Sequence, residues 1–396
     1  MISSPRFSNL LSWAVGFASV FALALAAPSL QHKRSQIHIV SPAQLGAGSD
    51  PRRAGMNVSE AYQPISSFLV KKPTYQVFSN FDFQSIALAL HQEYIELDLF
   101  NYALVKFSDA DYDAAGLDAD DRHLIRHMAQ QEIGHAVALS NMLGPKAPKM
   151  CTYRYEFQTV PEFIDFSQRL TKWGESGVYG FLNQLDNRAS AQILLQSITT
   201  EARQQMAFRQ FEGLFPMPEW FETGVPQSWA WTLLSPWIKS CPQENQPLAW
   251  EIYPALNWSN QPDAIAAGKA AGGPSISNNV TALTEEGQEN MFTWDSPGKT
   301  QGPYNQKTKT HTSGVPRFAA YVSQFNVTYA SLYDVDTNAR TAKARQPGGT
   351  VYAQGPTLVN STIFVALTDS DTFYTPANLS LINYHVVAGP AIYQAG

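Results

Sequence analysis

The chain has 396 residues, enough for two domains with ordinary hydrophobic cores. Only 15% of the residues are charged and the formal net charge is −6, so the composition lacks a basic excess and we expect no nucleic-acid partner. Beyond the N-terminal region, the sequence contains no run of the roughly 20 apolar residues that a membrane-spanning helix needs, so we expect no membrane span.

Residues 1–26 predict a secretory signal peptide. A basic residue precedes the apolar run Leu10–Ala26, which ends in Ala24-Leu25-Ala26, an Ala-x-Ala cleavage pattern. We therefore expect a secreted protein that is extracellular or resides in the cell wall. Residues 27–75 contain Pro, Gly and Ser without periodicity and predict an irregular N-terminal arm, in which Lys33-Arg34 is a candidate processing site.

Two further features agree with secretion. Asn-x-Ser/Thr sequons predict N-glycans in exposed loops, and they lie at Asn57, Asn257, Asn279, Asn326, Asn360 and Asn378. The only cysteines are Cys151 and Cys241. In an oxidising compartment two cysteines most simply form one disulfide, and the alternative is a pair of buried free thiols.

Helical periodicity begins near Asp82. Apolar residues then recur at steps of three and four along the first predicted helix, from Ile86 to Leu104. An acidic, Gly-containing turn region, Asp109–Asp121, offers N-cap residues for a second helix with the same kind of apolar stripe. Because Gly144-Pro145 ends this second helix, the two segments predict an antiparallel helical hairpin.

Residues 145–160 show no helical period. This stretch can extend to roughly 50 Å, whereas a helix of about 25 residues is only about 37 Å long, so it can cross the full length of a bundle. Pro161 suits the first turn of a third helix. The fourth helix follows a short link at Asp186–Arg188 and ends at Gly213. Residues 76–215 therefore predict a four-helix bundle of two hairpins joined by one long crossover.

The rest of the chain changes character twice. Residues 216–258 are rich in tryptophan, and we expect an extension that packs on the bundle; an aromatic platform for sugars is the alternative. Residues 259–315 are rich in small and polar residues and predict a linker. Residues 316–396 contain β-rich runs separated by turn clusters, namely Phe318–Leu332, Gly349–Gln354, Thr357–Leu367 and Leu379–Val387. These runs predict either a small β-sandwich or strands that pack on the bundle, so the expected fold class is α+β.

Each of the four predicted helices has an acidic residue near the centre of its apolar stripe, and these residues are Glu93, Glu132, Glu175 and Glu201. A buried carboxylate is costly unless it is paired or binds a metal ion. Four of them directed at one core predict a carboxylate-bridged site for two Fe or Mn ions. The alternative is a polar core network without metal.

The second and fourth helices place a second polar residue one turn after the glutamate, on the same face. The second helix has Glu132-x-x-His135, which is the pattern of a metal-binding helix, whereas the fourth has Glu201-x-x-Gln204. The expected ligand set is therefore Glu93, Glu132, His135, Glu175, Glu201 and Gln204. Glu96 competes with Glu93 for the first-helix position, and we prefer Glu93 because it is nearer the centre of the stripe. His123 and His127 have the spacing of a zinc pair, but they lie on the polar side of their helix, where we expect them to face solvent.

Several stretches of the sequence resemble a known family. Glu175-Ser176-Gly177-Val178-Tyr179-Gly180, followed by Thr200-Glu201-Ala202-Arg203, resembles the paired Glu-bearing helices of the secreted ferritin-like, desiccation-related proteins. Phe208–Pro218 and Gln227–Thr232 resemble the fungal branch known as late sexual development or stress-response proteins. The resemblance covers residues 75–256 and, more loosely, the C-terminal region.

The resemblance implies a ferritin-like four-helix bundle and a secreted protein with a stress- or development-linked role, but no particular reaction. We therefore expect a secreted ferritin-like protein whose carboxylate-rich Fe or Mn site serves metal or oxidant handling. The alternative is a non-enzymatic extracellular or cell-surface stress-protective protein with a metal-free polar core. Because Gln204 departs from the E-x-x-H pattern of the family and an amide is a poorer ligand than imidazole, we expect the second metal position to be weak.

Overall fold

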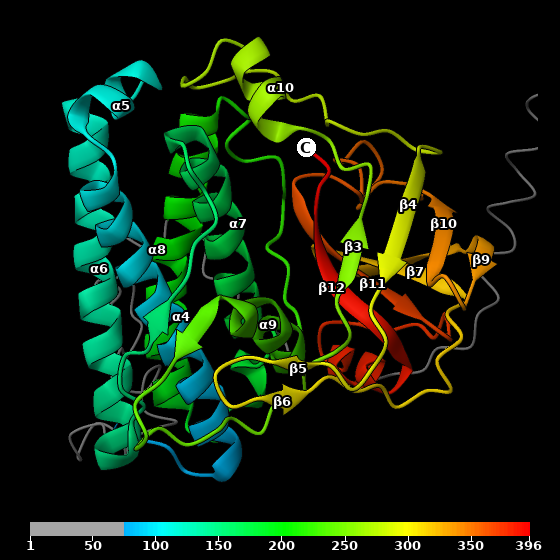
Figure 1. The fold of residues 1–396 in the computed structure, drawn as a ribbon, viewed down its shortest axis with the longest axis horizontal. Coiled ribbons are helices and arrows are strands. Elements are labelled where there is room, and N and C mark those ends of the chain that lie inside the picture. The colour runs from blue at the N-terminus through cyan, green and yellow to red at the C-terminus, as the bar shows by residue number, and fades with distance from the viewer. Residues whose placement is uncertain (1–74) are drawn as a thin grey trace, which may run out of the picture. The chain divides into compact units, whose positions relative to one another are not determined.

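The computed structural model describes residues 75–396. The predictions made for residues 1–74, which include the signal peptide, Lys33-Arg34 and the sequon at Asn57, lie outside the described residues. Figure 1 shows a helical region followed in the chain by a β-rich region, which is the expected α+β class. Within the described part of the chain, no helix combines the length and the apolar character needed to cross a membrane.

The four predicted helices are present. They and a short fifth helix have the bounds α4 (Asn80–Lys106), α5 (Asp109–Ala114), α6 (Ala119–Leu143), α7 (Val160–Tyr179) and α8 (Arg188–Glu212). Helix α4 packs along α6 and α7 packs along α8, and α4 also packs against α7. In Figure 1, α6 and α7 run in the same direction, so the chain between them crosses the length of the bundle, as predicted.

Local sequence sets the helix boundaries. Asp118 and Asp121 form a capping box at the start of α6, and Thr159 and Glu162 form another at the start of α7, which has Pro161 in its first turn. Gly213 ends α8 with φ of 87°, a left-handed conformation that glycine adopts without steric cost. Single-turn 3₁₀ helices lie at η3 (Gly144–Lys146), η4 (Leu182–Gln184) and η5 (Ser235–Trp237).

The crossover is joined to the Trp-rich extension. Strand β1 (Thr152–Tyr153) pairs antiparallel with β2 (Ile238–Ser240), and next to this ladder Cys151 and Cys241 form a disulfide with their Cα atoms 4.3 Å apart. The predicted disulfide is thus confirmed.

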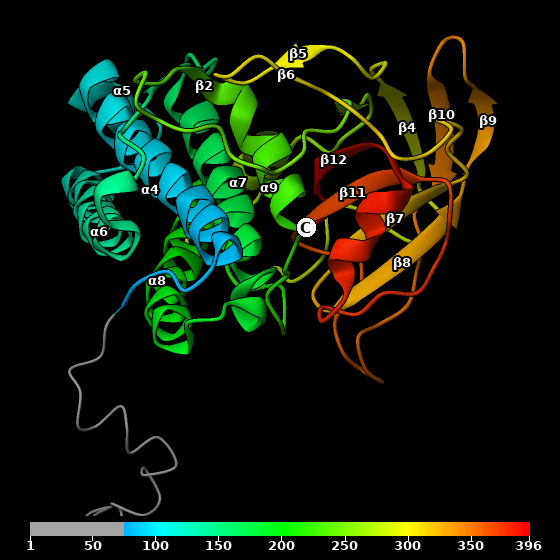
Figure 2. The same cartoon turned by 90° about the horizontal axis from the view of Figure 1, so that it is seen from below.

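The Trp-rich extension packs on the bundle, as the sequence favours. Its helix α9 (Gln227–Leu234) buries Trp229 and Trp231 completely. A Cβ added at Gly177 of α7 would lie 2.7 Å from the Cβ of Ala230, so glycine permits the close approach of α7 and α9. Figure 2 shows α9 between the bundle helices and the β-rich region.

The β-rich region contains two four-stranded sheets. The first has the order β3 (Leu256–Trp258), β4 (Glu289–Trp294), β10 (Thr341–Arg345) and β9 (Tyr333–Asp336). The second has the order β12 (Val386–Gln394), β11 (Thr362–Thr368), β7 (Phe318–Ser323) and β8 (Asn326–Ser331). Side chains of both sheets share one core, in which Trp258 stacks on Tyr393 with ring centroids 3.8 Å apart. The region is therefore a β-sandwich.

The second sheet is buried on both faces. From strand β11, Ile363 and Val365 enter the sandwich core, whereas Phe364 and Ala366 belong to the same hydrophobic cluster as the bundle. Both sequence alternatives therefore hold, because the strands form a sandwich and the sandwich packs on the helices. The unbroken apolar run of β11 reflects burial on two sides.

Some boundaries differ from the sequence prediction. The predicted linker, residues 259–315, contains α10 (Ala264–Ala270), β4, β5 (Thr300–Gln301) and β6 (Gln306–Lys307). The run Gly349–Gln354 forms only an isolated bridge from Thr350 to Thr357, and Leu379–His385 is a 3₁₀ helix, η6, before β12. The hairpin of β9 and β10 was not predicted, because its inward residues are only alanines, Ala342 and Ala344, and short polar strands depend on their neighbours for stability.

Candidate metal centre

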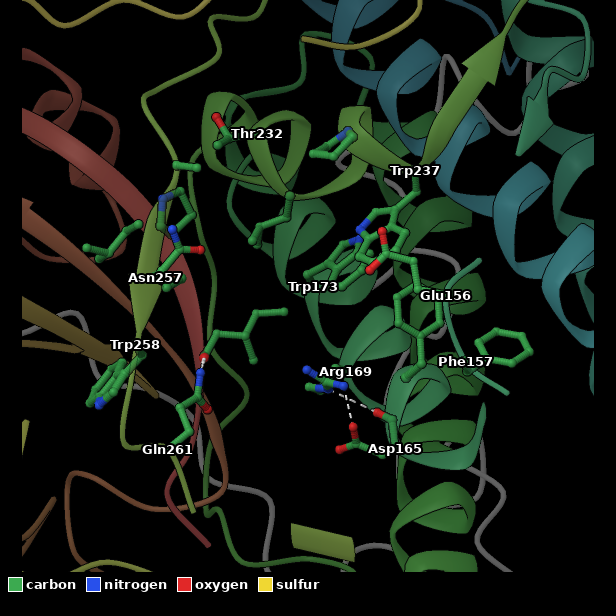
Figure 3. Close-up of a pocket in the computed structure, with 18 of the residues that line it drawn as sticks. Glu156, Phe157, Asp165, Arg169, Trp173, Thr232, Trp237, Asn257, Trp258 and Gln261 are labelled. Carbon is green, nitrogen blue, oxygen red and sulfur yellow. Dashed lines mark hydrogen bonds and ion pairs between the residues drawn. The ribbon is translucent and has the colours of Figure 1, made fainter. Parts of the chain in front are cut away.

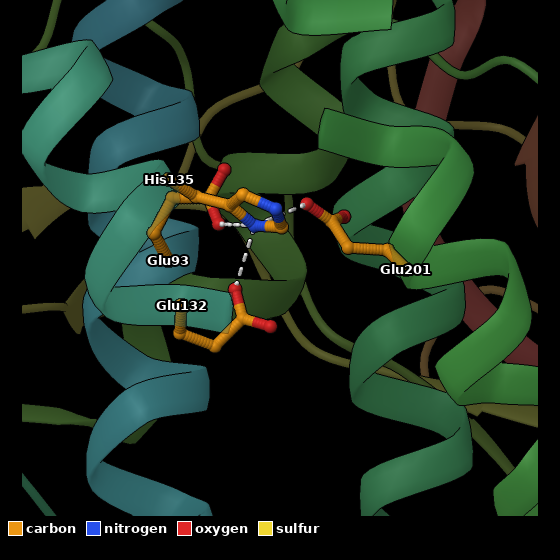
Figure 4. A group of neighbouring side chains, drawn as sticks. All are labelled: Glu93, Glu132, His135 and Glu201. Atoms are coloured by element: carbon orange, nitrogen blue, oxygen red, sulfur yellow. Dashed lines mark hydrogen bonds and ion pairs between the residues drawn. The ribbon is translucent and has the colours of Figure 1, made fainter. Parts of the chain in front are cut away.

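Three helices bring four predicted ligands together in the middle of the bundle. Glu93 of α4, Glu132 and His135 of α6, and Glu201 of α8 place one ligand atom each within 4.8 Å of one another. Figure 4 shows these side chains converging from both sides of the bundle core. The three glutamates are at most 1% exposed, whereas the side chain of His135 is 12% exposed, so the carboxylates are buried and the imidazole lies next to solvent.

A buried aspartate ties the helices that carry the cluster. Asp82, in the first turn of α4, accepts hydrogen bonds from the backbone N–H groups of Asp186 and Asn187 at 2.8 and 3.2 Å. These contacts join the start of α4 to the start of α8, because Asn187 is the N-cap of α8. They help to set the axial positions at which Glu93 and Glu201 enter the core.

His135 is the centre of the cluster. Its Nδ1 lies 3.1 Å from Oε2 of Glu93, 3.1 Å from Oε2 of Glu132 and 3.8 Å from Oε1 of Glu201. Its Nε2 lies 3.1 Å from the hydroxyl of Thr200, which donates its own proton to the Ser197 carbonyl at 2.8 Å. Nε2 therefore carries a proton and donates to Thr200, and Nδ1 is the nitrogen directed at the carboxylates. This is the arrangement of a metal-binding histidine whose second nitrogen is held by an outer partner.

The electrostatics of the cluster favour a bound cation. Burial raises the pKa of the Glu93 carboxyl well above its ordinary value, and the charge of Glu132 raises it further. Burial likewise raises the pKa of Glu201, as do the charges of Glu93, Glu96 and Glu132. For His135, burial lowers the pKa, but hydrogen bonding to Glu132 and the nearby carboxylate charges outweigh it and leave the pKa raised. Without a metal ion, the site therefore gathers protons.

Glu96 lies beside the cluster. It is fully buried one turn after Glu93, and Gln92 donates to its Oε1 at 3.0 Å. Gln92 is itself fixed by Trp173 of α7, whose indole N–H donates to the Gln92 carbonyl at 3.0 Å. Glu93, the preferred first-helix ligand, is the one within the four-residue group, and Glu96 adds a further negative charge next to it.

Glu175 of α7 is not brought into this group. Its Oε1 lies 3.2 Å from Nζ of Lys172, which also contacts Glu219 at 2.7 Å and Glu222. Lys172 and Glu175 are both fully buried. Gln168, Lys172 and Glu175 share one helical stripe, and this spacing could have predicted that Lys172 is buried beside Glu175. The contacts of Lys172 with Glu219 and Glu222 could not be predicted, because these two residues lie in a loop without periodicity.

Gln204 contacts the cluster as a hydrogen-bond donor. Its Nε2 lies 2.5 Å from Oε1 of Glu132 and 3.2 Å from Oε1 of Gln131. The amide therefore satisfies one oxygen of Glu132. His123 and His127 are exposed, as expected for the polar side of α6.

The residues present fit a transition-metal ion. Three buried acceptor atoms around the cluster accept no hydrogen bond from residues 75–396, namely Oε2 of Glu96, Oε2 of Glu201 and Oε1 of Gln204. A buried acceptor without a donor is costly, and a cation would satisfy such atoms. Three carboxylates with one imidazole form a donor set that suits Fe or Mn.

Comparison with known proteins agrees with this geometry. Residues 81–214, which span α4 to α8, match the profile of the ferritin-like domain. The chain is also 51% identical over 336 residues to protein rds1 of Schizosaccharomyces pombe, an alignment that covers 82% of this chain and 83% of that protein. The bundle topology, the Glu132-x-x-His135 pair and this similarity lead to one conclusion: the chain belongs to the ferritin-like protein family that includes protein rds1 of Schizosaccharomyces pombe.

Proposed function

We propose that the protein binds one Fe or Mn ion per chain and acts outside the cell in metal or oxidant handling under stress or during development. The observation that carries the proposal is the convergence of Glu93, Glu132, His135 and Glu201, with the three carboxylates buried in the core of the bundle. An extracellular or cell-wall location is supported by the predicted signal peptide, by the sequons and by the disulfide.

The cluster residues and Thr200 would have different roles in metal binding. Glu93, Glu132, Glu201 and Nδ1 of His135 would hold the ion, and Thr200 would keep the imidazole in the tautomer that frees Nδ1. A bound Fe or Mn ion would supply one-electron chemistry toward O2 or peroxide. The surrounding helices bury the carboxylates and thereby raise the pKa values of Glu93 and Glu201. These carboxylates therefore bind protons, which a metal ion would replace.

Two features support one ion rather than two. A carboxylate that bridges two ions with one oxygen on each needs both oxygens free, but Gln204 already donates to Oε1 of Glu132. The third-helix ligand of a two-metal site would be Glu175, and this carboxylate is paired with Lys172. The expected third-helix ligand is therefore paired with a buried cation of the chain itself.

One observation favours the alternative function. The bonds from His135 to Glu93 and Glu132, together with the bond from Gln204 to Glu132, form a polar network that links these residues without metal. On this alternative the protein is a non-enzymatic extracellular stress-protective protein, and its buried charges help to specify one packing of the core.

Metal content separates the two functions. The full chain is loaded with Fe²⁺ or Mn²⁺, desalted, and its metal-to-protein ratio is measured by mass spectrometry. We expect about one ion for the wild type, a large loss for Glu201→Gln, and no loss for Glu212→Gln, which changes a buried glutamate of the same helix outside the cluster. The absence of metal from all three proteins would establish the metal-free alternative. Two firmly held ions in the wild type would contradict the single-ion site.

The location is tested on the native protein. Mass spectrometry of culture medium and cell-wall extracts should find the chain there, with a mature N-terminus after Ala26 or after Arg34. Recovery only from the cytosol with an intact N-terminus would contradict secretion.

A further inference from the structure

A cavity of about 700 Å³ lies between the bundle and the β-sandwich. Helix α7 and the crossover form one wall, and β3, the segment after it and β12 form the other, as Figure 3 shows. The α9–η5 segment, with Thr232 and Trp237, closes one end. The volume falls within the range of about 300–1,000 Å³ that is typical of small-molecule sites.

Four side chains at this cavity keep unused polar groups. Among the described residues, the carboxylate of Glu156, the amide of Asn257 and the indole N–H of Trp237 make no hydrogen bond with another residue, and all three line the cavity. The buried indole N–H of Trp258, which also lines the cavity, has no hydrogen-bond partner among the described residues either. Two further polar residues there are engaged. Gln261 donates to the Ile392 carbonyl at 2.7 Å, and Asp165 is paired with Arg169.

The charge of the lining excludes anionic ligands. The lining contains three carboxylates, from Glu156, Glu162 and Asp165, and one guanidinium, from Arg169, so negative groups outnumber positive ones. Phosphates, nucleotides and fatty acids would therefore be repelled.

The lining also contains aromatic surface. Phe157, Phe166, Trp173 and Trp237 line the cavity from the bundle side. The rings of Phe166 and Trp237 pack against each other with centroids 4.6 Å apart. Trp237 is also partly exposed, so part of its indole is accessible to a ligand. Aromatic rings with a polar edge combine a large apolar face with a hydrogen-bonding tip.

A ligand for this cavity needs an apolar face, several hydroxyl groups that can both donate and accept, and no negative charge. A neutral pyranose sugar has these properties, because its axial C–H groups form an apolar face and its rim is polar. We propose that the cavity is a binding site for a neutral oligosaccharide, with Trp237 as the stacking platform and Glu156 and Asn257 as hydrogen-bonding partners.

Such a saccharide has two chemical sources. It is either a free oligosaccharide or an N-glycan attached to the chain itself, because Asn257 begins the sequon Asn257-Trp258-Ser259 and its side chain is exposed at the cavity. A glycan attached to Asn257 would itself fill the cavity and leave no room for a free sugar. The proposal does not depend on the metal centre, since no cavity-lining residue belongs to the metal cluster.

The test uses the full chain with and without the Ser259→Ala substitution, which removes the sequon and keeps the Asn257 side chain at the cavity. Both proteins are made in a glycosylating host. Each protein is titrated with maltotetraose, cellotetraose and tetra-N-acetylchitotetraose, and binding is followed by calorimetry and by saturation-transfer NMR. We expect at least one of these sugars to bind saturably with one site per chain. We expect trigalacturonate, an anionic sugar, not to bind.

Three variants locate the site. Trp237→Ala should weaken binding at least tenfold, and so should Glu156→Ala, which changes an exposed residue and preserves folding. Trp220→Ala, which removes an exposed tryptophan outside the cavity, should bind like the wild type. Binding by the Ser259→Ala protein alone identifies the occupant as the chain's own glycan, and equal binding by both proteins identifies a free saccharide. The proposal is overturned if neither protein binds a neutral sugar, or if Trp237→Ala and Glu156→Ala bind as tightly as Trp220→Ala.

Discussion

The side-chain amide of Gln204 donates a hydrogen bond of 2.5 Å to Oε1 of Glu132. The other oxygen of Glu132, Oε2, lies 3.1 Å from Nδ1 of His135. One oxygen of this carboxylate therefore faces the cluster and the other is satisfied by a neutral amide. A histidine at position 204 would present a ligand atom here, whereas glutamine presents a donor. This contact, together with the pairing of Glu175 with Lys172, makes the centre asymmetric.

Replacement of Gln204 tests this asymmetry. Gln204→His should release Oε1 of Glu132 and add an imidazole, so we expect the metal-to-protein ratio to rise above that of the wild type. The matched control is Gln205→His, because Gln205 is also buried but contacts Gln168 at 3.4 Å. The ratio is measured by mass spectrometry after Mn²⁺ loading. Equal ratios for both variants would show that Gln204 does not limit the second position.

Thr200 should act as a positioning residue for His135. Thr200→Val removes the acceptor for Nε2 and lets the imidazole change its tautomer or turn, so the affinity for metal should fall by about 10–100-fold. The adjacent Thr199 is exposed and bonds only the Gln196 carbonyl, which makes Thr199→Val the control. Competition titration with a chelator measures both affinities. Unchanged affinity for Thr200→Val would mean that the ring is held by other contacts.

Lys172 should be critical for stability. It is fully buried and is the cation shared by Glu175, Glu219 and Glu222. Lys172→Met leaves these carboxylates without a counterion and should lower the free energy of unfolding by about 3–5 kcal/mol. Lys239→Met, at an exposed position on β2, should change it by less than about 0.5 kcal/mol. Urea titration followed by circular dichroism gives both values, and similar losses would contradict the assignment.

The metal-free protein should lose stability as pH rises. The pKa values of Glu93, Glu96, Glu175 and Glu201 are raised in the folded state, chiefly by burial, above the ordinary value of 4.5. These groups hold protons more tightly when folded, so their contribution is fully present below pH 4.5 and declines as pH rises above it. The raised pKa of His135 acts in the same direction.

Thermal denaturation at several pH values between 5 and 8 measures this effect. With a chelator present, Tm should fall as pH rises across this range. With Mn²⁺ present the decline should be smaller, because the ion replaces the protons and stabilises the folded state. Glu201→Gln should flatten the slope of the metal-free protein, since the amide does not titrate. A Tm that rises with pH in the chelated wild type would contradict the prediction.

The disulfide should contribute strongly to stability. Cys151 and Cys241 are 90 residues apart in sequence, and the loop-closure entropy of such a link is worth about 4–5 kcal/mol as an upper bound. The double variant Cys151→Ser, Cys241→Ser should therefore unfold at a clearly lower urea concentration. The oxidised wild type is the control, and a loss below about 1 kcal/mol would show that the β1–β2 pairing holds the crossover alone.

The sequence by itself determined the bundle and most of its centre. Apolar stripes, the caps at Asp118 and Thr159 and the stop at Gly213 are local signals, because a helix is built from contacts three and four residues apart. The spacing of Glu132 and His135 is likewise local. Two cysteines allow only one intrachain pairing, so the disulfide could also be predicted.

Only the tertiary structure decided the partners of the remaining groups. Glu175 is paired with Lys172, and the carboxylates of Glu219 and Glu222 reach the same ammonium group from a loop more than forty residues further along the chain. Strand β4 lies in a region that reads as a linker, because its stability comes from pairing with β3 and β10. Charge pairing and strand pairing depend on distances in space, and helical periodicity carries no information about which distant segment supplies the partner.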